Sequence, residues 1–365
     1  MHRSLKTSRI SRLLIPTSTV VSLSILASCG GSRLGGQFSA QYVYVATGTS
    51  IAQYAITIDG QLIPQYPPAA ASSNAVWVVL NPKGTYAYAA NKANNTLSQY
   101  TVGGTGLLTA QSPATVTTGN APDSVVVSPD GKYVYVLNSG DSNITGFSIG
   151  STGALSSLAT VNSAVAADGK QLLVNGNFLY AISYSSGKIN AFSIGVDGSL
   201  TPLAVPSYNV GSSSGATFSP DGKHLYVPDS TAGVAQFAVN TDGSLSPLSP
   251  ATVAGVAPGN DTFGVSPNGK YGYLGSFNGG VPGSPVAQFS IGASGALSGL
   301  VPLSVTAMNA PQWIFFDASN KYAYVANGND GTISEYSIKG DGTLAPLSPA
   351  AVNTGGALQV TMLIH

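Results

Sequence analysis

The chain of 365 residues is longer than one ordinary globular core needs, so it consists of several domains or of one repeated unit. Hydrophobic residues make up 43% and charged residues only 8%, which excludes a disordered polar chain. The 44 glycines and 22 prolines follow no three-residue period, which excludes collagen and indicates many turns. Because 14 basic residues balance 14 acidic ones, no basic excess points to nucleic-acid binding.

The N-terminal segment has the order of a secretion signal. Basic residues within the first twelve positions precede an apolar stretch, residues 13–26, that is too short and too interrupted to span a bilayer stably. The stretch ends in Leu26-Ala27-Ser28-Cys29, which resembles a bacterial lipobox, and Cys29 is the only cysteine. We therefore predict a lipoprotein signal peptide over residues 1–28 and lipid on Cys29. An ordinary secretory signal with a chance cysteine is the alternative.

This signal predicts a protein of the bacterial cell envelope. Its lipid would hold it at the outer membrane or the periplasmic face, or on the cell surface. Residues 29–40 are rich in glycine and predict a flexible tether with a reach of roughly 18 Å. Loss of four of the 14 basic residues with the leader would leave ten against 14 acidic ones, a net charge of about −4. With a single cysteine, the chain forms no internal disulfide.

From residue 41 onward the sequence repeats. A turn of the type Asp-Gly-x-Leu recurs every 45 to 52 residues, and a mostly aromatic pair recurs in step with it. The turn glycines are Gly60, Gly106, Gly153, Gly198, Gly243, Gly295 and Gly342. The pairs are Tyr42/Tyr44, Tyr86/Tyr88, Tyr133/Tyr135, Phe178/Tyr180, His224/Tyr226, Tyr271/Tyr273 and Tyr322/Tyr324. Two markers with one period and seven copies indicate a repeat architecture.

Each repeat contains four apolar or alternating runs separated by turn signals, which predicts four β-strands. In the clearest repeat these are residues 123–128, 132–137, 144–149 and 154–161. A sheet that is apolar on both faces must be covered on both, and radial stacking of sheets achieves this. The first repeat lacks an innermost strand, whereas residues 358–364 supply a surplus one.

These patterns predict an all-β fold over residues 41–365. The expected architecture is a seven-bladed β-propeller with four antiparallel strands per blade, closed by one C-terminal and three N-terminal strands. An open solenoid with exposed ends is the alternative.

The repeat resembles that of a known family. The resemblance is carried by residues 128–136 (Ser-Pro-Asp-Gly-Lys-Tyr-Val-Tyr-Val), by their copies at 219–227 and 266–274, and by Phe289-Ser290-Ile291 before a Gly-x-Leu turn. These segments are similar to the propellers of the lactonase-like family, which includes bacterial 6-phosphogluconolactonases and muconate-type cycloisomerases. They also resemble surface-layer propellers with tyrosine-valine repeats. The resemblance covers residues 41–365 and implies a seven-bladed propeller that opens lactones.

The resemblance also implies where a site would lie. In the family, His and Arg stand at the channel mouth near the start of innermost strands, in segments like Gly-Pro-Arg-His. The matching segment here is Ala310-Pro311-Gln312-Trp313, with Gln312 in the place of the arginine and Trp313 in the place of the histidine. A sugar phosphate is best bound by arginine or clustered cations, and lactone hydrolysis needs a general base or a metal-held water.

Loops at one rim of the predicted propeller carry five aspartates and two lysines: Asp123, Asp141, Asp229, Asp261 and Asp330, and Lys92 and Lys188. Asp123 and Asp261 share a register in their blades and are the candidate catalytic residues. The candidate ligand-binding residues are Gln312, Trp313, Asp229 and Lys188. For each aspartate, the alternative is that it caps a turn and accepts backbone N–H groups.

Other conspicuous residues have structural interpretations. His224 takes the register of the first aromatic residue of the pair, so we expect packing there and not catalysis. Trp77 is expected to pack between blades, whereas Trp313 either stacks a sugar or ring-shaped ligand or plugs the space between blades. The long loop 276–285 is either a recognition loop or a tolerated insertion.

The sequence contains no phosphate-binding glycine loop, zinc-type Cys/His cluster or Gly-x-Ser-x-Gly elbow, so we predict no metal and no cofactor. The main hypothesis is a lipid-anchored extracytoplasmic module that binds a small molecule or a protein at its rim. The alternative is a lactonase-like hydrolase of the 6-phosphogluconolactonase type. We expect a monomer that is bound to the membrane by its lipid and does not bind nucleic acid.

Overall fold

β-Strands make up the regular structure in the computed structural model, which describes residues 38–213, 215–230, 232–255, 259–276, 283–354 and 362–364. Runs of Val, Ile, Tyr and Phe between turn residues favour short strands, and 27 strands form within these ranges. The same ranges contain no helix that is long and apolar enough to cross a membrane. The predicted signal peptide, Cys29 and most of the predicted tether lie outside the described residues.

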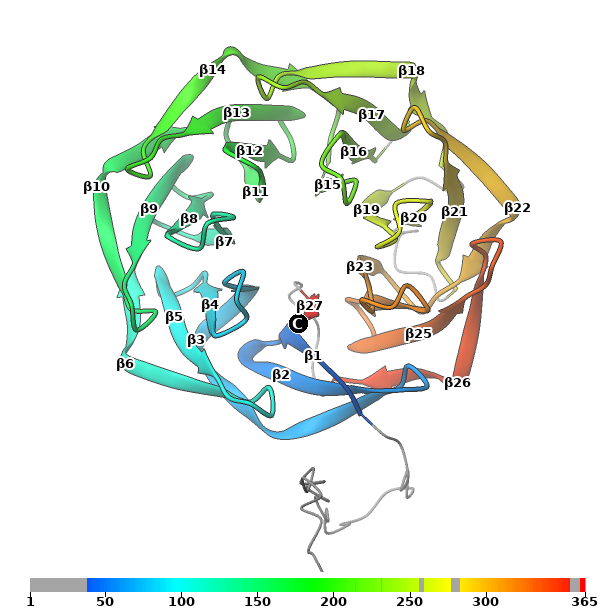
Figure 1. Ribbon diagram of the computed structural model, residues 1–365, viewed down its shortest axis with the longest axis horizontal. Coiled ribbons are helices and arrows are strands. Elements are labelled where there is room, and N and C mark those ends of the chain that lie inside the picture. Colours follow the sequence, from blue (N-terminus) through cyan, green and yellow to red (C-terminus); the bar gives the residue numbers. More distant parts are fainter. Residues whose placement is uncertain are drawn as a thin grey trace, which may run out of the picture. The chain divides into compact units, whose positions relative to one another are not determined.

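The strands form seven blades around one axis (Figure 1), and blades 3 to 7 each use consecutive antiparallel strands. Blade 3 contains β7 (Pro122–Val127), β8 (Tyr133–Asn138), β9 (Asn143–Ile149) and β10 (Leu155–Ala164). Blade 4 contains β11 (Gly169–Asn175), β12 (Phe178–Ser183), β13 (Lys188–Ile194) and β14 (Leu200–Asn209). Blade 5 contains β15 (Thr217–Phe218), β16 (His224–Asp229), β17 (Gly233–Val239) and β18 (Leu245–Val253). Blade 6 contains β19 (Asn260–Val265), β20 (Tyr271–Ser276), β21 (Pro285–Ile291) and β22 (Leu297–Thr306). Blade 7 contains β23 (Pro311–Phe316), β24 (Tyr322–Asn327), β25 (Thr332–Ile338) and β26 (Leu344–Asn353).

Blades 1 and 2 share one long strand, β3 (Leu62–Leu80). Its first part pairs with β2 (Gly48–Thr57) of blade 1, and its last part pairs with β4 (Tyr86–Asn91) of blade 2. Blade 2 is completed by β5 (Thr96–Val102) and β6 (Leu108–Thr117). The repeat pattern did not predict this shared strand. The residues 71–74 near the middle of β3 include Ser72, Ser73 and Asn74, which favour a turn, and Asn74 has a φ of 57°, yet the strand continues through them.

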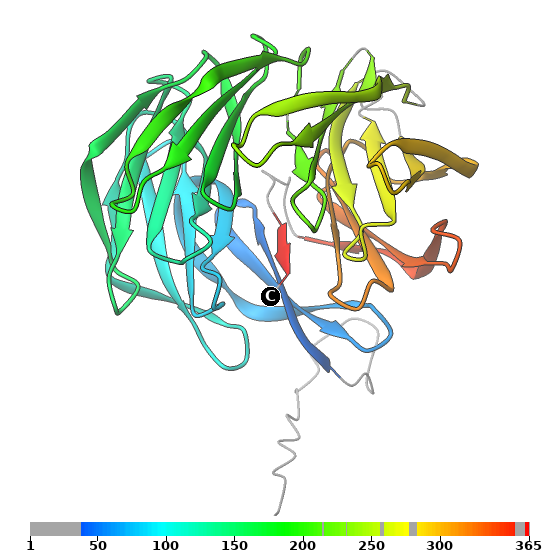
Figure 2. The ribbon, with the colours of Figure 1, turned by 45° about the horizontal axis from the view of Figure 1, so that its top comes forward.

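Blade 1 is closed by strands from both ends of the described chain. Its order is β27 (Met362–Ile364), β1 (Phe38–Ala46), β2 and the first part of β3, and Figure 2 shows β27 in red beside β1 in blue. Val43, Tyr44 and Val45 pair with the three residues of β27. This confirms the predicted seven-bladed propeller and its closure. β1 begins at Phe38, within the segment predicted as tether, and predicted strand residues 358–361 lie outside the described residues.

A ring of tyrosine hydrogen bonds joins each blade to the next. The second residue of every aromatic pair is a fully buried tyrosine whose hydroxyl donates, over 2.6–2.9 Å, to the carbonyl oxygen of the turn glycine in the following blade. The pairs are Tyr44–Gly106, Tyr88–Gly153, Tyr135–Gly198, Tyr180–Gly243, Tyr226–Gly295, Tyr273–Gly342 and Tyr324–Gly60. The last pair joins blade 7 to blade 1, so this tyrosine belt is a closed circle.

The first residue of each pair explains why these turns need glycine. The seven turn glycines have φ between 77° and 86°, and a Cβ on any of them would overlap the ring of the first residue of the preceding blade's pair. In blade 5 that ring belongs to His224, which lies against Gly295. His224 is therefore a packing residue, as expected. The turn glycine and the aromatic pair, which mark the repeat in the sequence, therefore contact each other where one blade meets the next.

A second joint uses buried glutamines on the third strands. Each accepts the N–H of the turn leucine of the next blade at Oε1 and donates from Nε2 to the carbonyl oxygen of a proline 14 residues later. These residues are Gln53, Gln99, Gln236 and Gln288. In blade 7 the position is taken by Glu335, which is 0% exposed and accepts the Leu62 N–H at 2.7 Å.

Candidate functional site at the loop rim

Connections between antiparallel strands alternate between the two ends of a sheet, so the propeller has two different rims. The rim that we call the turn rim carries the Ser-Pro-Asp-Gly and Asp-Gly-x-Leu turns. The other, which we call the loop rim, carries the loops that lead into the innermost strands and the loops between the second and third strands. The charged residues indicated by the sequence belong to the loop rim.

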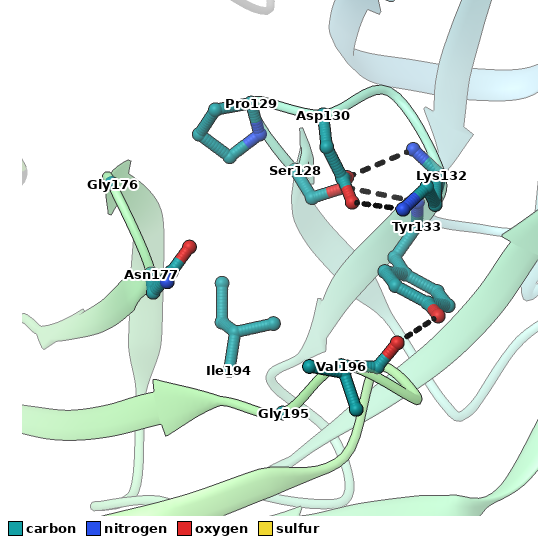
Figure 3. Close-up of a pocket in the computed structure, with 10 residues that line it drawn as sticks. All are labelled: Ser128, Pro129, Asp130, Lys132, Tyr133, Gly176, Asn177, Ile194, Gly195 and Val196. Carbon is teal, nitrogen blue, oxygen red and sulfur yellow. Dashed lines mark hydrogen bonds and ion pairs between the residues drawn. The ribbon is translucent and has the colours of Figure 1, made fainter.

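The turn rim carries hollows that follow from the repeat. One of about 150 Å³ lies between blades 3 and 4, where residues 128–133 face residues 194–196 (Figure 3). There Asp130 accepts hydrogen bonds from Ser128 and Lys132, and the Tyr133 hydroxyl donates to the carbonyl oxygen of Val196. Residues of the same register line a second hollow between blades 5 and 6. Because the same hollow recurs between other blades, the way in which neighbouring blades pack accounts for it, and no ligand is needed to explain it.

Asp123 and Lys92 form the most buried ion pair among the described residues. Asp123 lies at the start of β7, and Lys92 belongs to the loop between β4 and β5 of the preceding blade. Lys92 Nζ donates to Asp123 Oδ1 at 2.6 Å, and the exposed fractions of the two side chains are 33% and 10%. Asp123 Oδ2 is buried and has no hydrogen-bond partner within the described part of the chain. The pair therefore holds a carboxylate with one oxygen still able to accept.

Asp123 lies in a β-bulge that recurs where innermost strands begin. The register moves from Pro122–Asn138 directly to Ser124–Leu137, which leaves Asp123 as the extra residue. The same step in other blades gives Val76, Lys170, Asp261 and Gln312. The shared register predicted for Asp123 and Asp261 is present in the backbone. The side chain of Asp261, the other candidate catalytic residue, lies outside the described residues.

Lys170 is a rim residue that the sequence pattern did not indicate. Its Nζ lies 3.6 Å from Asp168 Oδ1, and the exposed fractions of the two side chains are 35% and 38%. Blade 4 joins its first two strands by Gly176 and Asn177, a connection shorter than the Ser-Pro-Asp-Gly turn, so the register of Lys170 was hidden. If residues had been counted back from the aromatic pair Phe178/Tyr180 with a shorter turn allowed, Lys170 would have been assigned to the same register as Asp123.

Three of the other rim aspartates cap loops. The backbone N–H of Asn120 donates to Asp141 at 2.8 Å and its side chain donates at 2.7 Å, and these bonds lower the pKa of Asp141. In the corresponding loop of blade 7, the N–H of Asn309 donates to Asp330 at 2.7 Å. Asp229 accepts the N–H of Ala232 at 3.3 Å. These contacts fit the turn-capping alternative.

Two candidate ligand-binding residues lie on other blades. The side-chain amide of Gln312 lies so close to Gly328, in the next loop of blade 7, that a Cβ there would overlap it. Lys188 is the first residue of β13 in blade 4 and is exposed. The structure thus brings Asp123 together with Lys92, and Lys170 together with Asp168. It places Gln312 and Lys188 at separate points of the same rim.

Trp313 meets Trp77 in the middle of the ring. Their ring centroids are 5.4 Å apart and their planes cross at 79°. Trp77 belongs to blade 2 and Trp313 to blade 7, so the contact passes across blade 1. Trp77 is 9% exposed, in agreement with the packing expected for it.

The described side chains of the loop rim are net acidic. Five aspartates (Asp123, Asp141, Asp168, Asp229 and Asp330) stand against three lysines (Lys92, Lys170 and Lys188). The lysines belong to blades 2 and 4 only, so positive charge is confined to one side of the rim. Within the described ranges, no three His, Cys, Asp or Glu side chains gather as metal ligands would.

The model of the family described as "Lactonase, 7-bladed beta-propeller" matches residues 49–170, the segment that holds Lys92, Asp123 and Lys170. The chain is a seven-bladed β-propeller that resembles this lactonase family over those residues. No curated protein sequence matches it. The family match favours the lactonase-like alternative over the binding-module hypothesis.

The propeller is similar in structure to solved proteins of the same fold. One is a proposed 6-phosphogluconolactonase of Bacteroides fragilis, with 21% identity, a TM-score of 0.75, and coverage of 92% of this chain and 100% of that one. Another is a periplasmic gluconolactonase of Pseudomonas aeruginosa, with 18% identity, a TM-score of 0.72, and coverage of 89% and 99%. At these identities the similarity shows the fold, which agrees with the seven blades.

Proposed function

We propose that this propeller hydrolyses a neutral sugar lactone at its loop rim, with Asp123 as the residue that activates water. The observation that carries the proposal is the Asp123–Lys92 pair, a buried carboxylate that is ion-paired through one oxygen and able to accept through the other. The lactonase family match spans both residues. A gluconolactonase among the structurally similar proteins supports a lactone as the substrate class.

The chemistry of the pair suits the opening of a lactone. Asp123 accepts a proton from a water molecule while the oxygen of that water bonds to the carbonyl carbon. The ammonium group of Lys92 stabilises the negative charge that develops on the carbonyl oxygen. The ring C–O bond then breaks, and the leaving ring oxygen takes the proton from Asp123. A hydroxy acid is released and the carboxylate is restored.

Access to Asp123 depends on Lys92. Asp123 Oδ2 is buried, and the Asp123 side chain as a whole is 10% exposed. The Lys92 side chain is 33% exposed. Movement of the lysine side chain, the more exposed of the two partners, would free Asp123 Oδ1 for a water molecule and leave the ammonium group available for an incoming carbonyl oxygen.

The charge of the rim favours a neutral lactone over a phosphorylated one. A phosphate group carries about two negative charges at pH 7, and two like charges 4 Å apart repel by roughly 4 kcal/mol at an effective dielectric constant near 20. Five rim aspartates add to this repulsion, and three lysines offset only part of it. Gln312 stands where the family resemblance implies arginine, and a neutral amide makes no charge-assisted bond to phosphate.

The test is acid release from glucono-δ-lactone and from its 6-phosphate by the purified protein. We expect turnover of the neutral lactone in preference to the phosphate, and a kcat/KM roughly 100-fold lower in Asp123→Asn. Asp130→Asn is the matched control, because Asp130 pairs with Lys132 at 3.3 Å on the turn rim. Wild-type turnover in Asp123→Asn would contradict the role of Asp123. Saturable lactone binding without turnover would favour a binding module.

We also propose that the protein is held at the bacterial cell envelope, as a monomer, by lipid on Cys29. The lipobox-like residues 26–29 support this, and the similar gluconolactonase of Pseudomonas aeruginosa is named as periplasmic. Cys29→Ser should leave the protein unprocessed or release it from the membrane. Mass spectrometry of the membrane-extracted wild-type protein is the check, and a Cys29 without acyl chains would contradict the proposal.

A further inference from the structure

The two tryptophans occupy one register of the innermost strands, directly after the bulge. In blades 3 and 4 this register ties neighbouring blades together: Ser124 Oγ accepts the Leu172 N–H at 3.0 Å, and Gln171 Oε1 accepts the Ala216 N–H at 2.6 Å. In blades 2 and 7 the same register holds Trp77 and Trp313. The chain has only two tryptophans, so both lie at this one level.

The indole of Trp313 spans the middle of the ring. It packs against the core cluster that contains Val43 and Phe315, and against the cluster that contains Trp77 and Val125. On blade 5, a Cβ on Gly215 would lie 3.8 Å from Cζ3 of Trp313 and 2.9 Å from Gln171 Oε1. A side chain from blade 7 thus reaches residues of blades 1, 2 and 5, which closes the ring at this level.

The exposed surface of this aromatic pair belongs to Trp313. Trp77 is 9% exposed, whereas Trp313 is only partly buried. Ile314 and Phe315, the next residues of β23 toward the turn rim, are 5% and 7% exposed. Along β23, exposure therefore ends at Trp313 when the strand is followed from the loop rim, through Gln312, toward the turn rim.

We infer that Trp77 and Trp313 form an aromatic floor beneath the loop rim, and that a neutral sugar lactone docks with the C–H face of its ring on Trp313. The inference rests on the proposed function. An uncharged indole recognises the ring itself and needs no phosphate. The bulge residues Asp123 and Lys170 lie one strand residue, about 3.3 Å, further toward the loop rim, where the carbonyl and hydroxyl groups of the docked ring would be.

Intrinsic fluorescence tests this directly because each single variant keeps one tryptophan. The probe is glucono-δ-lactam, an uncharged ring that does not open in water. In Trp77→Phe the emission of Trp313 should change saturably with the lactam, whereas in Trp313→Phe the emission of Trp77 should not. Gluconate, the opened acid, is the control ligand, and melting curves check that both variants are folded. For Trp313→Ala we expect KM for the lactone to rise roughly threefold to tenfold, with a smaller effect on kcat.

The outcomes separate this inference from the proposed function. If the lactam inhibits turnover but the emission of Trp313 stays constant, the floor is wrong and the lactonase proposal stands. If the emission of Trp313 responds saturably and no lactone is turned over, the floor stands and the catalytic proposal fails. If no lactone is turned over and the emission of Trp313 also stays constant, both are overturned. An unchanged KM in a folded Trp313→Ala would also contradict the floor.

Discussion

Glu335 differs from its counterparts in four other blades by one side-chain group, a carboxylate oxygen where they have an amide nitrogen. Each of those glutamines donates to the carbonyl oxygen of a proline 14 residues later, and Pro349 follows Glu335 at the same separation. Burial of a carboxylate charge is unfavourable, whereas an amide is neutral at every pH. At 0% exposure, Glu335 therefore makes the stability of this joint depend on charge, which the glutamine joints do not.

Replacement of Glu335 by glutamine should stabilise the protein. The amide keeps the acceptor for the Leu62 N–H and removes the cost of burying a charge, which contributes about 1 kcal/mol and raises Tm by roughly 1–3 °C. Calorimetry at pH 7 to 8 measures the change. Gln288→Glu makes the reverse exchange in blade 6 and should lower Tm. A lower Tm for Glu335→Gln would contradict this account.

The sequence predicted which residues lie at the rim, but it did not predict which of them contact one another. Lys92 and Asp123 were both indicated as rim residues, but their ion pair joins two blades, and spacing within one repeat does not reveal such a contact. Lys170 was hidden by a shortened turn. From the sequence, Trp313 could be interpreted either as a plug or as a stacking platform. Its contact with Trp77, which shows that it reaches the middle of the ring, is visible only in the structure.

At the scale of elements, the turn glycine and the aromatic ring form the joint between blades. Gly106→Ala should be strongly destabilising, by about 2–4 kcal/mol, because its φ is 77° and a Cβ would overlap the Tyr42 ring. Gly104→Ala is the matched control in the same turn, since a Cβ there meets nothing within 4 Å. Denaturant unfolding should place Gly104→Ala within about 0.5 kcal/mol of wild type. Equal effects of the two substitutions would show that the joint does not depend on this contact.

The strand pattern was predictable because each blade repeats the same turn chemistry. The predicted strands of blade 3 coincide with β7 to β10 to within a few residues at their ends. The shared strand β3 was not predictable from that pattern, since Ser72, Ser73 and Asn74 favour a turn and the strand nevertheless runs through them. The bulge at the start of the innermost strands of blades 2, 3, 4, 6 and 7 was also hidden, because an extra residue leaves no mark in the alternation of a buried strand.

For the whole molecule, the tyrosine belt predicts sensitivity to alkali. Burial raises the pKa of all seven belt tyrosines above the ordinary value of 10. The unfolded state therefore loses these protons first, and the free energy of unfolding falls above pH 10 by up to about 1.4 kcal/mol per pH unit for each tyrosine.

We expect cooperative unfolding near pH 11, in which at least seven of the 18 tyrosines ionise only as the circular dichroism signal is lost. Absorbance at 295 nm measures tyrosinate during the same titration. Ionisation of all 18 near pH 10 with an intact dichroism signal would contradict the belt. Below pH 10 this contribution to stability is fully present.

Closure of the ring gives a further prediction at the same scale. Deletion of residues 358–365 removes β27 and leaves the edge of β1 unpaired, so we expect aggregation or loss of a cooperative melting transition. Light scattering and calorimetry are the measurements. A truncated protein that melts like the full chain would show that β27 does not hold the ring.

The place of β27 after all the other described strands also sets the timing of folding. Residues 362–364 are synthesised after the strands of blades 2 to 7, yet they pair with residues 43–45, which precede those blades. The first blade therefore stays incomplete until the other six have been made, and contacts this distant in sequence form slowly. A ring that stays open for so long is accessible to chaperones and to a translocation channel while the blades are synthesised. The closed ring then depends on a strand of three residues that is made after all the blades that it joins.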